Sequence, residues 1–141
     1  MKKLAVVYWT GTGNTEKMAN AVVDGAKGVG ADVSLFEVND FSVDTISDYD
    51  AIAFGCPAMG DEELEEVEFA PMFDEAKGLL GAKPIGLFGS YSWADGEWMD
   101  NWVEDCNESG LNIATDPVIA FDDPDDDAIE ACKTLGANLG K

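Results

Sequence analysis

The chain has 141 residues, no histidine and no arginine, and a formal net charge of −21 at pH 7. Without histidine it has no Ser-His-Asp triad and no histidine metal ligand, and without arginine it has no bidentate fork for phosphate. These absences weigh against hydrolysis and phosphoryl transfer and favour chemistry carried by a bound cofactor. The charge argues against nucleic acid and anionic membranes as partners.

The length predicts a single domain, residues 1–141, with a sizeable core. We find no apolar run near the ~18 residues of a membrane span and no signal peptide, so we expect a cytoplasmic protein. The cysteines are odd in number and scattered, which predicts reduced thiols. Two of them, Cys106 and Cys132, fall on apolar helix faces and are expected in the core, whereas Cys56 follows a strand.

The first predicted element is a buried strand at residues 4–9, rich in β-branched and aromatic residues. It ends at a loop of small, hydroxylated and glycine residues, Thr10–Thr15, and a helical pattern follows at once. A strand, a tight loop and a helix aim free backbone N–H groups at an anion. An N-capped turn without a ligand is the plainer alternative for this loop.

Further strands and helices alternate along the rest of the chain. Strands are predicted at residues 33–38, 51–55, 83–89 and 118–121, and the last lies beside Pro117 and is expected at an edge. Residues 39–48 are predicted as a loop with one helical turn. The later helices carry apolar residues at helical spacing, at 69–80, 99–106 and 128–139, and the last of these begins with Asp125, Asp126 and Asp127.

This alternation predicts an α/β fold: a doubly wound, five-stranded parallel sheet in the order 2-1-3-4-5, with helices on both faces. In such sheets ligands bind beyond the carboxyl ends of the strands. The loops expected there are residues 9–15, 56–62 and 89–98. The first loop fits neither the P-loop, which needs Gly-Lys-Ser/Thr, nor the dinucleotide fingerprint, which needs a third glycine where Glu16 stands.

Three stretches in these loops resemble the flavodoxin family, short-chain clostridial type. They are Thr-Gly-Thr-Gly-Asn-Thr at 10–15, Ala-Met-Gly-Asp-Glu at 58–62 and Gly-Ser-Tyr-Ser-Trp at 89–93, with Asp-Gly-Glu-Trp after it. The resemblance implies a flavodoxin-like fold and non-covalently bound FMN. It implies these cofactor-binding residues: Thr10, Gly11, Thr12, Gly13, Asn14, Thr15, Ala58, Met59, Gly60, Asp61, Glu62, Ser90, Tyr91, Ser92, Trp93 and Ala94.

The resemblance also implies what these residues do. Met59 and Trp93 would sandwich the flavin, and Glu62 would hydrogen-bond the N3 edge of the flavin. Ser90 would join the first loop around the phosphate. The Gly60–Asp61 peptide would flip on one-electron reduction, so that the Gly60 carbonyl accepts a hydrogen bond from flavin N5–H. Ser92 and Ala94 depart from the family pattern, which commonly has glycine at both positions, and Thr10 stands where serine is common.

A hydrogen bond made only in the radical state stabilises the neutral semiquinone. An anionic hydroquinone packed in so acidic a protein is disfavoured, so the second potential should be low. The expected function is a low-potential one-electron carrier that cycles mainly between semiquinone and hydroquinone. It would shuttle electrons between redox proteins in place of ferredoxin, and it would have no substrate of its own.

Two acidic runs remain. We interpret the first, which includes Asp61, Glu62, Glu65 and Glu68, as a docking surface for basic redox partners near the flavin edge, with salt-sensitive encounter. The second, residues 122–127, is interpreted as a solvated face, and it lacks the spacing of an EF-hand. No metal site is expected, and with no apolar stripe left for an interface the protein is expected to be a monomer.

Two alternatives use the same topology. A flavodoxin-fold quinone or NAD(P)H oxidoreductase would need a second substrate pocket, for which this short chain offers little material. A response-regulator-like domain would need an acidic cluster after the first strand and an aspartate after the third. The chain has threonine and glycine at the first place and Cys56-Pro57 at the second.

Overall fold

The computed structural model describes residues 2–11, 13–59, 64–65, 67–91 and 96–141. Its strands are β1 (Lys3–Tyr8), β2 (Asp32–Glu37), β3 (Ala51–Gly55), β4 (Pro84–Tyr91), β5 (Asn112–Ile113) and β6 (Val118–Phe121). Its α-helices are α1 (Asn14–Gly28), α2 (Phe69–Leu80), α3 (Glu97–Glu108) and α4 (Asp126–Gly140), and two 3-10 helices, η1 (Val38–Asp40) and η2 (Val43–Asp48), follow β2.

The strands form one parallel sheet in the order β2-β1-β3-β4-β5, with β6 also paired to β4. The predicted order is confirmed. The predicted fifth strand, residues 118–121, is β6, and the structure adds the unpredicted strand β5: β5 pairs with the start of β4 and β6 pairs with its end. Between them lies Pro117, which has no N–H for a ladder, and a two-residue strand such as β5 is too short to leave a periodic signal.

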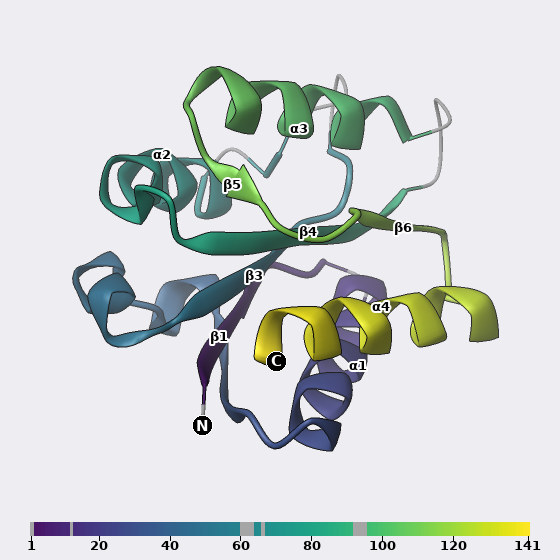
Figure 1. The fold of residues 1–141 in the computed structure, drawn as a ribbon. Helices are drawn as coiled ribbons and strands as arrows, with labels where there is room; N and C mark the ends of the chain where they lie inside the picture. Colours follow the sequence, from purple (N-terminus) through teal and green to yellow (C-terminus); the bar gives the residue numbers. More distant parts are fainter. Residues whose placement is uncertain (1, 12, 60–63, 66, 92–95) are drawn as a thin grey trace.

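Helices cover both faces of the sheet, α1 and α4 on one and α2 and α3 on the other (Figure 1). The central strands explain this layering, since every residue of β3 and all of β1 after Lys3 are buried. Buried apolar residues on both faces of a strand need cover on both sides. The strand β2 lies at the edge and is largely half-buried or exposed, as its alternating sequence predicts.

Two glycines let α1 and α4 pack at close range. A Cβ atom on Gly25 would lie 1.9 Å from the Lys133 carbonyl oxygen, and one on Gly136 would lie 2.0 Å from that of Val22. Both obstacles are helix backbone, which cannot move aside as a side chain can. Any larger residue at either position would therefore force the two helices apart.

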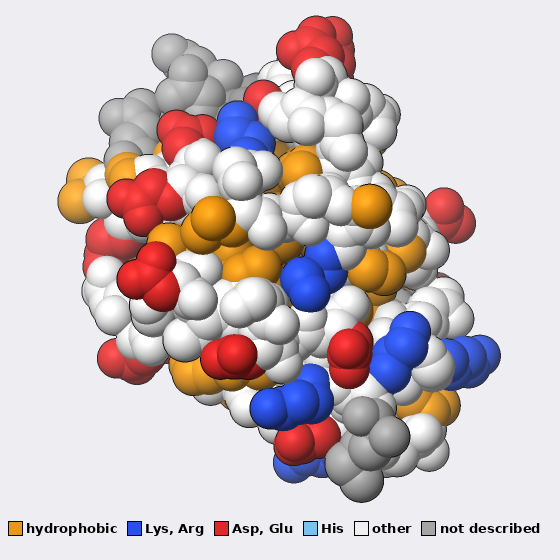
Figure 2. All heavy atoms as spheres, turned by 60° about the vertical axis from the view of Figure 1, so that its left-hand side comes forward, with side chains coloured by type: hydrophobic (Ala, Val, Ile, Leu, Met, Phe, Trp, Pro, Cys, Tyr) orange, Lys and Arg blue, Asp and Glu red, His pale blue; other side chains and the backbone are white. Residues whose placement is uncertain are grey.

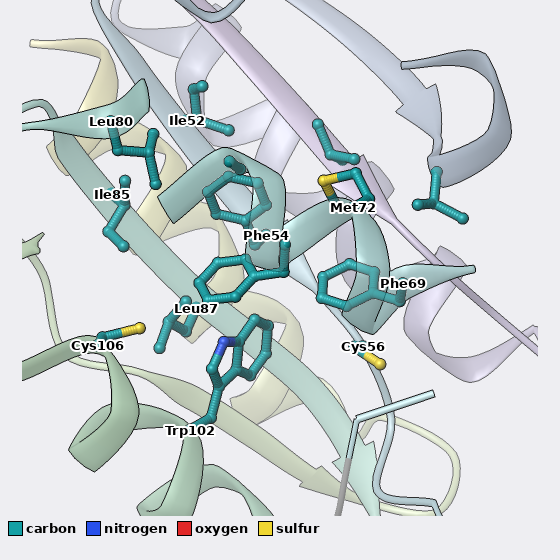
Figure 3. Packing of buried hydrophobic residues seen from close by; sticks show 14 of the residues in the cluster. Ile52, Phe54, Cys56, Phe69, Met72, Leu80, Ile85, Leu87, Trp102 and Cys106 are labelled. Atoms are coloured by element: carbon teal, nitrogen blue, oxygen red, sulfur yellow. The ribbon is translucent and has the colours of Figure 1, made fainter. Parts of the chain in front are cut away.

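An aromatic cluster fills the opposite layer. Phe69 of α2 meets Trp102 of α3 with ring centroids 5.6 Å apart and nearly perpendicular, and Phe54 of β3 meets Phe73 in the same manner at 5.1 Å. Figure 3 shows Phe54, Phe69 and Trp102 converging from their three elements. This edge-to-face packing fixes α2 and α3 against the sheet. Because Phe69 is the first residue of α2, the packing also fixes where that helix starts.

The three cysteines are buried free thiols. Cys106 and Cys132 lie in the core, as predicted, and burial raises the pKa of each of the three thiols to about 12. Within the described part of the chain, no helix is both long and apolar enough to span a membrane. The polar stretch after β2 is more regular than predicted, because both η1 and η2 form there around the buried anchors Phe41 and Ile46.

Candidate functional site

The carboxyl edge of the sheet, where the parallel strands end, brings the beginnings of the three predicted loops together. The Trp9 N–H donates to the Gly55 carbonyl at 3.0 Å, and the Cys56 N–H donates to the Phe88 carbonyl at 3.1 Å. The Ala58 N–H then donates to the Ser90 carbonyl at 3.0 Å. Segments that are far apart in sequence therefore share one edge, as the parallel order requires.

The first loop turns sharply into α1. Gly13 adopts φ +94°, a conformation that favours glycine, and its N–H donates to Thr10 Oγ1 at 2.9 Å. Because the cap residue Gly13 has no side chain, it offers no side-chain acceptor to the amides of the first helical turn. The N-terminal amides of a helix that lack a capping side chain attract an anion.

Hydroxyls gather beside this helix end. Thr15 in the first turn of α1 and Ser90 near the end of β4 are both buried, and their Oγ atoms lie 3.3 Å apart. The two hydroxyls and the helix amides are short, neutral donors at the positions where the resemblance expects the FMN phosphate. This donor set fits a phosphate monoester, and Asn14 stands in the same first turn.

Charged groups around the first loop are bound to protein partners. Lys17 Nζ pairs with Asp123 Oδ1 at 2.6 Å, and Glu16 Oε2 accepts a hydrogen bond from the Tyr8 hydroxyl at 3.1 Å. Burial and the neighbouring Glu16 raise the pKa of Tyr8 to about 12. An anion at the start of α1 would therefore be held by neutral donors and the helix end.

Some predicted site residues lie outside the described part of the chain, namely Thr12, Gly60, Asp61, Glu62, Ser92, Trp93 and Ala94. Among the others, Ala58 is buried and Met59 and Tyr91 are half-buried. Tyr91 packs between Trp98 and Phe121, with ring centroids at 5.6 and 5.4 Å. Gly11 is exposed, and the ring of Trp9 lies against it. The roles of all these residues toward a cofactor stay predictions.

The sequence reasoning missed a contact between the first loop and the start of α2. Trp9 Nε1 donates to Glu68 Oε1 at 3.1 Å, which connects the end of β1 to the residue just before α2. The sequence patterns place Trp9 where the first strand meets the first loop and Glu68 in the first acidic run, and they predict no contact between the two. An aromatic residue that ends a buried strand beside a glycine-rich loop was the available signal.

The first acidic run does not form a uniformly solvated surface. Glu65 is 6 % exposed, and its carboxylate accepts backbone N–H bonds from Val67, Glu68 and Phe69 at 2.7–2.9 Å. Burial by itself would raise the pKa of Glu65, but these three donors together outweigh it and lower the pKa. The inclusion of Glu65 in the docking surface is therefore wrong, because its charge faces the chain's own amides.

The remaining acidic residues are distributed more widely. In the second run, Asp123 pairs with Lys17, and Asp125 caps α4 by accepting from the Ala128 N–H at 2.8 Å. Figure 2 shows the face on the left of Figure 1, where acidic side chains are spread among lysines and hydrophobic groups. Among the described residues, no group of three or more cysteines and carboxylates could hold a metal ion.

Comparison with known proteins is consistent with this geometry. A family model described as flavodoxin matches residues 6–135. The chain is 43% identical to a flavodoxin of Megasphaera elsdenii over 136 residues, covering 96% of this chain and 97% of the relative. It is 42% identical to a flavodoxin of Clostridium beijerinckii over 136 residues, covering 96% and 98%.

A solved structure gives the same match in three dimensions. The solution structure of two-electron reduced Megasphaera elsdenii flavodoxin superposes with a TM-score of 0.89 at 42% identity, covering 97% of this chain and 98% of that one. Sequence and structure therefore agree over nearly the whole length of both proteins. The chain belongs to the flavodoxin family, whose members carry FMN and transfer electrons.

Proposed function

We propose that this protein is a low-potential one-electron carrier that holds FMN non-covalently and cycles mainly between its neutral semiquinone and hydroquinone states. It would shuttle electrons between redox proteins in place of ferredoxin, and it would not be an enzyme with its own substrate. The observation that carries the proposal is the start of α1, where amides without a capping side chain stand beside the buried Thr15 and Ser90 hydroxyls.

Charge supports the low potential. The chain carries a net charge of −21, and the cation nearest the first loop in sequence, Lys17, is paired with Asp123. The negative charge that full reduction would add to the flavin ring, beyond the charge of the phosphate, would lie in an acidic protein with few nearby cations. This disfavours the fully reduced anion. The predicted flip at Gly60 would favour the neutral radical, which would raise the potential of the first one-electron step and lower that of the second.

The proposed partners are basic redox proteins that dock near the flavin edge. Steering by an acidic surface speeds encounter and weakens as salt rises. With Glu65 buried, this surface would rest on the other acidic residues around the site. We further propose that the protein works as a cytoplasmic monomer.

Stepwise anaerobic reduction of the purified protein, followed by its visible spectrum, tests the carrier function. A blue neutral radical that accumulates midway is the expected result. Direct passage to the two-electron form would contradict the carrier and favour the oxidoreductase alternative. Turnover of NAD(P)H by the protein alone would favour that alternative as well, and failure to bind added FMN would mean that the three-loop site is misassigned.

A further inference from the structure

The buried carboxylate of Glu65 holds the turn that begins α2. Glu65 Oε1 accepts from the Glu68 N–H at 2.7 Å and from the Phe69 N–H at 2.8 Å, while Oε2 accepts from the Val67 N–H at 2.9 Å. Its own carbonyl accepts from the Ala70 N–H at 2.8 Å. The side chain and the carbonyl of Glu65 thus hold the backbone amides of residues 67–70 at the start of the helix.

The same residue also ties this turn to the end of β3. The Glu65 N–H donates to Cys56 Sγ at 3.3 Å, although eight residues, 57–64, separate the two along the chain. Cys56 in turn is fixed to β4 through Phe88, and its carbonyl accepts from Trp98 Nε1 at 3.1 Å. The chain just before Ala58 and Met59 is therefore hydrogen-bonded, through Cys56, both to β4 and to Glu65 before α2.

Ordinary helix capping does not require this arrangement. An exposed Ser, Thr, Asp or Asn at the cap position would satisfy one or two first-turn amides without burying a charge. Here the cap residue Glu68 makes no such bond, and its carboxylate accepts from Trp9 Nε1 instead. Burying an ionised carboxylate carries a desolvation penalty that good hydrogen bonds must offset. Such a costly arrangement suggests that the position of this turn matters to the neighbouring loops.

We propose that Glu65 is a positioning residue for the flavin: by fixing the start of α2 against Cys56, it sets where Ala58 and Met59 meet the cofactor and so sets the one-electron potentials. The proposal rests on the proposed function. Through Glu68, the same turn is also connected to Trp9 at the start of the first loop. Glu65 is therefore linked by hydrogen bonds to the ends of both β1 and β3.

The test compares three variants of the FMN-loaded protein by potentiometric titration. Glu65→Gln keeps the shape but places an NH₂ donor against at least one backbone N–H, and Glu65→Asp keeps the charge with a shorter reach. Glu108→Gln removes the same charge from the exposed end of α3, near the amino end of β4 and away from the predicted site. The quantity compared is the equilibrium constant for forming the one-electron-reduced state from the oxidised and two-electron-reduced states.

We expect this constant to fall roughly tenfold in Glu65→Gln, a narrowing of ~59 mV between the two one-electron potentials. We expect a smaller fall in Glu65→Asp and no change in Glu108→Gln. Lower thermal stability with unchanged potentials would overturn the proposal, because Glu65 would then serve the fold alone. Loss of folding in both Glu65 variants would overturn it for the same reason, whereas a wild-type protein without a one-electron state would contradict the proposed function itself.

Discussion

The starts of α1 and α2 lie at the same edge of the sheet but treat negative charge in opposite ways. At α2 the chain supplies its own anion, because the Glu65 carboxylate accepts from Val67, Glu68 and Phe69. At α1 the cap residue is glycine. The acidic residue of its first turn, Glu16, accepts instead from the Tyr8 hydroxyl. The amides at the start of α2 are thus bound by a carboxylate of the protein, whereas the start of α1 has no capping side chain.

The contrast between the two helix ends explains how an acidic protein could bind an anionic cofactor. The positive end of a helix dipole attracts any nearby carboxylate, and this chain has 29 acidic residues that could compete for it. Glycine at the α1 cap and the bond from Tyr8 to Glu16 keep that competition away from the first loop. In the proposed function, the phosphate of FMN would be the anion that binds at the start of α1.

The largest expected effect comes from giving α1 an anion of its own. In Thr10→Asp a carboxylate would replace the hydroxyl that accepts from the Gly13 N–H. Two negative charges about 4 Å apart repel by about 4 kcal/mol at an effective dielectric constant near 20. FMN affinity measured by fluorescence quenching should fall at least about 100-fold, while the stability of the FMN-free protein rises by up to about 1 kcal/mol. Thr10→Ser is the control, and equal affinity in the Asp variant would refute the assignment.

The next effect removes the internal anion of α2. Glu65→Gln should lower the free energy of unfolding by about 2–3 kcal/mol at pH 7, since hydrogen bonds to a charged group are lost. The folded-state pKa of Glu65 is lowered, so its stabilisation is present above the unfolded-state value near 4.5 and is lost as pH falls through the folded-state value. Denaturant titrations of both proteins should therefore converge on acidification below about pH 5. A difference that stays constant down to pH 3 would argue against an ionised Glu65.

A moderate effect is expected at the hydroxyl pair of α1 and β4. Thr15→Val removes the Oγ1 atom that lies 3.3 Å from Ser90 Oγ and should weaken FMN binding about tenfold, as expected for one lost donor of ~1.4 kcal/mol. Thr134→Val makes the same change at an exposed position of α4 and should leave FMN binding unchanged. Equal binding by the two variants would place the phosphate elsewhere.

The smallest effect concerns the residue that keeps Glu16 away from the helix amides. Tyr8→Phe removes one partly buried hydrogen bond and should destabilise the protein by about 0.5–1.5 kcal/mol. The folded-state pKa of Tyr8 is raised from 10.0 to about 12, so the wild-type advantage is present below pH 10 and is lost as pH rises through 12. Unfolding free energies of both proteins across that range check this, and parallel curves would contradict it.

Sequence reasoning could predict the fold and the first loop because both depend on local patterns. Apolar runs such as residues 51–55 identify doubly buried strands, and the glycines and threonines of residues 10–15 lie next to one another in the chain. The meeting of Thr15 with Ser90 followed from the parallel order and from the family resemblance. Each of these inferences needed only neighbours in sequence or a known topology.

The role of Glu65 could not be predicted in this way. In the sequence it is one of several acidic residues between Asp61 and Glu68, and no local pattern distinguishes a carboxylate turned inward from those turned to solvent. Its burial depends on Cys56, which lies nine positions earlier in the chain, and on the amides at the start of α2. The contact of Trp9 with Glu68 likewise joins two elements 59 residues apart.

Amide hydrogen exchange, measured with and without FMN, tests the contrast between the two helix ends most directly. The amides of Asn14 and Thr15 at the start of α1 should exchange fast without FMN and become protected when it binds. Those of Val67, Glu68 and Phe69 should be protected in both states, because Glu65 already accepts from them. Protection that appears on FMN binding at α2 but not at α1 would contradict the assignment.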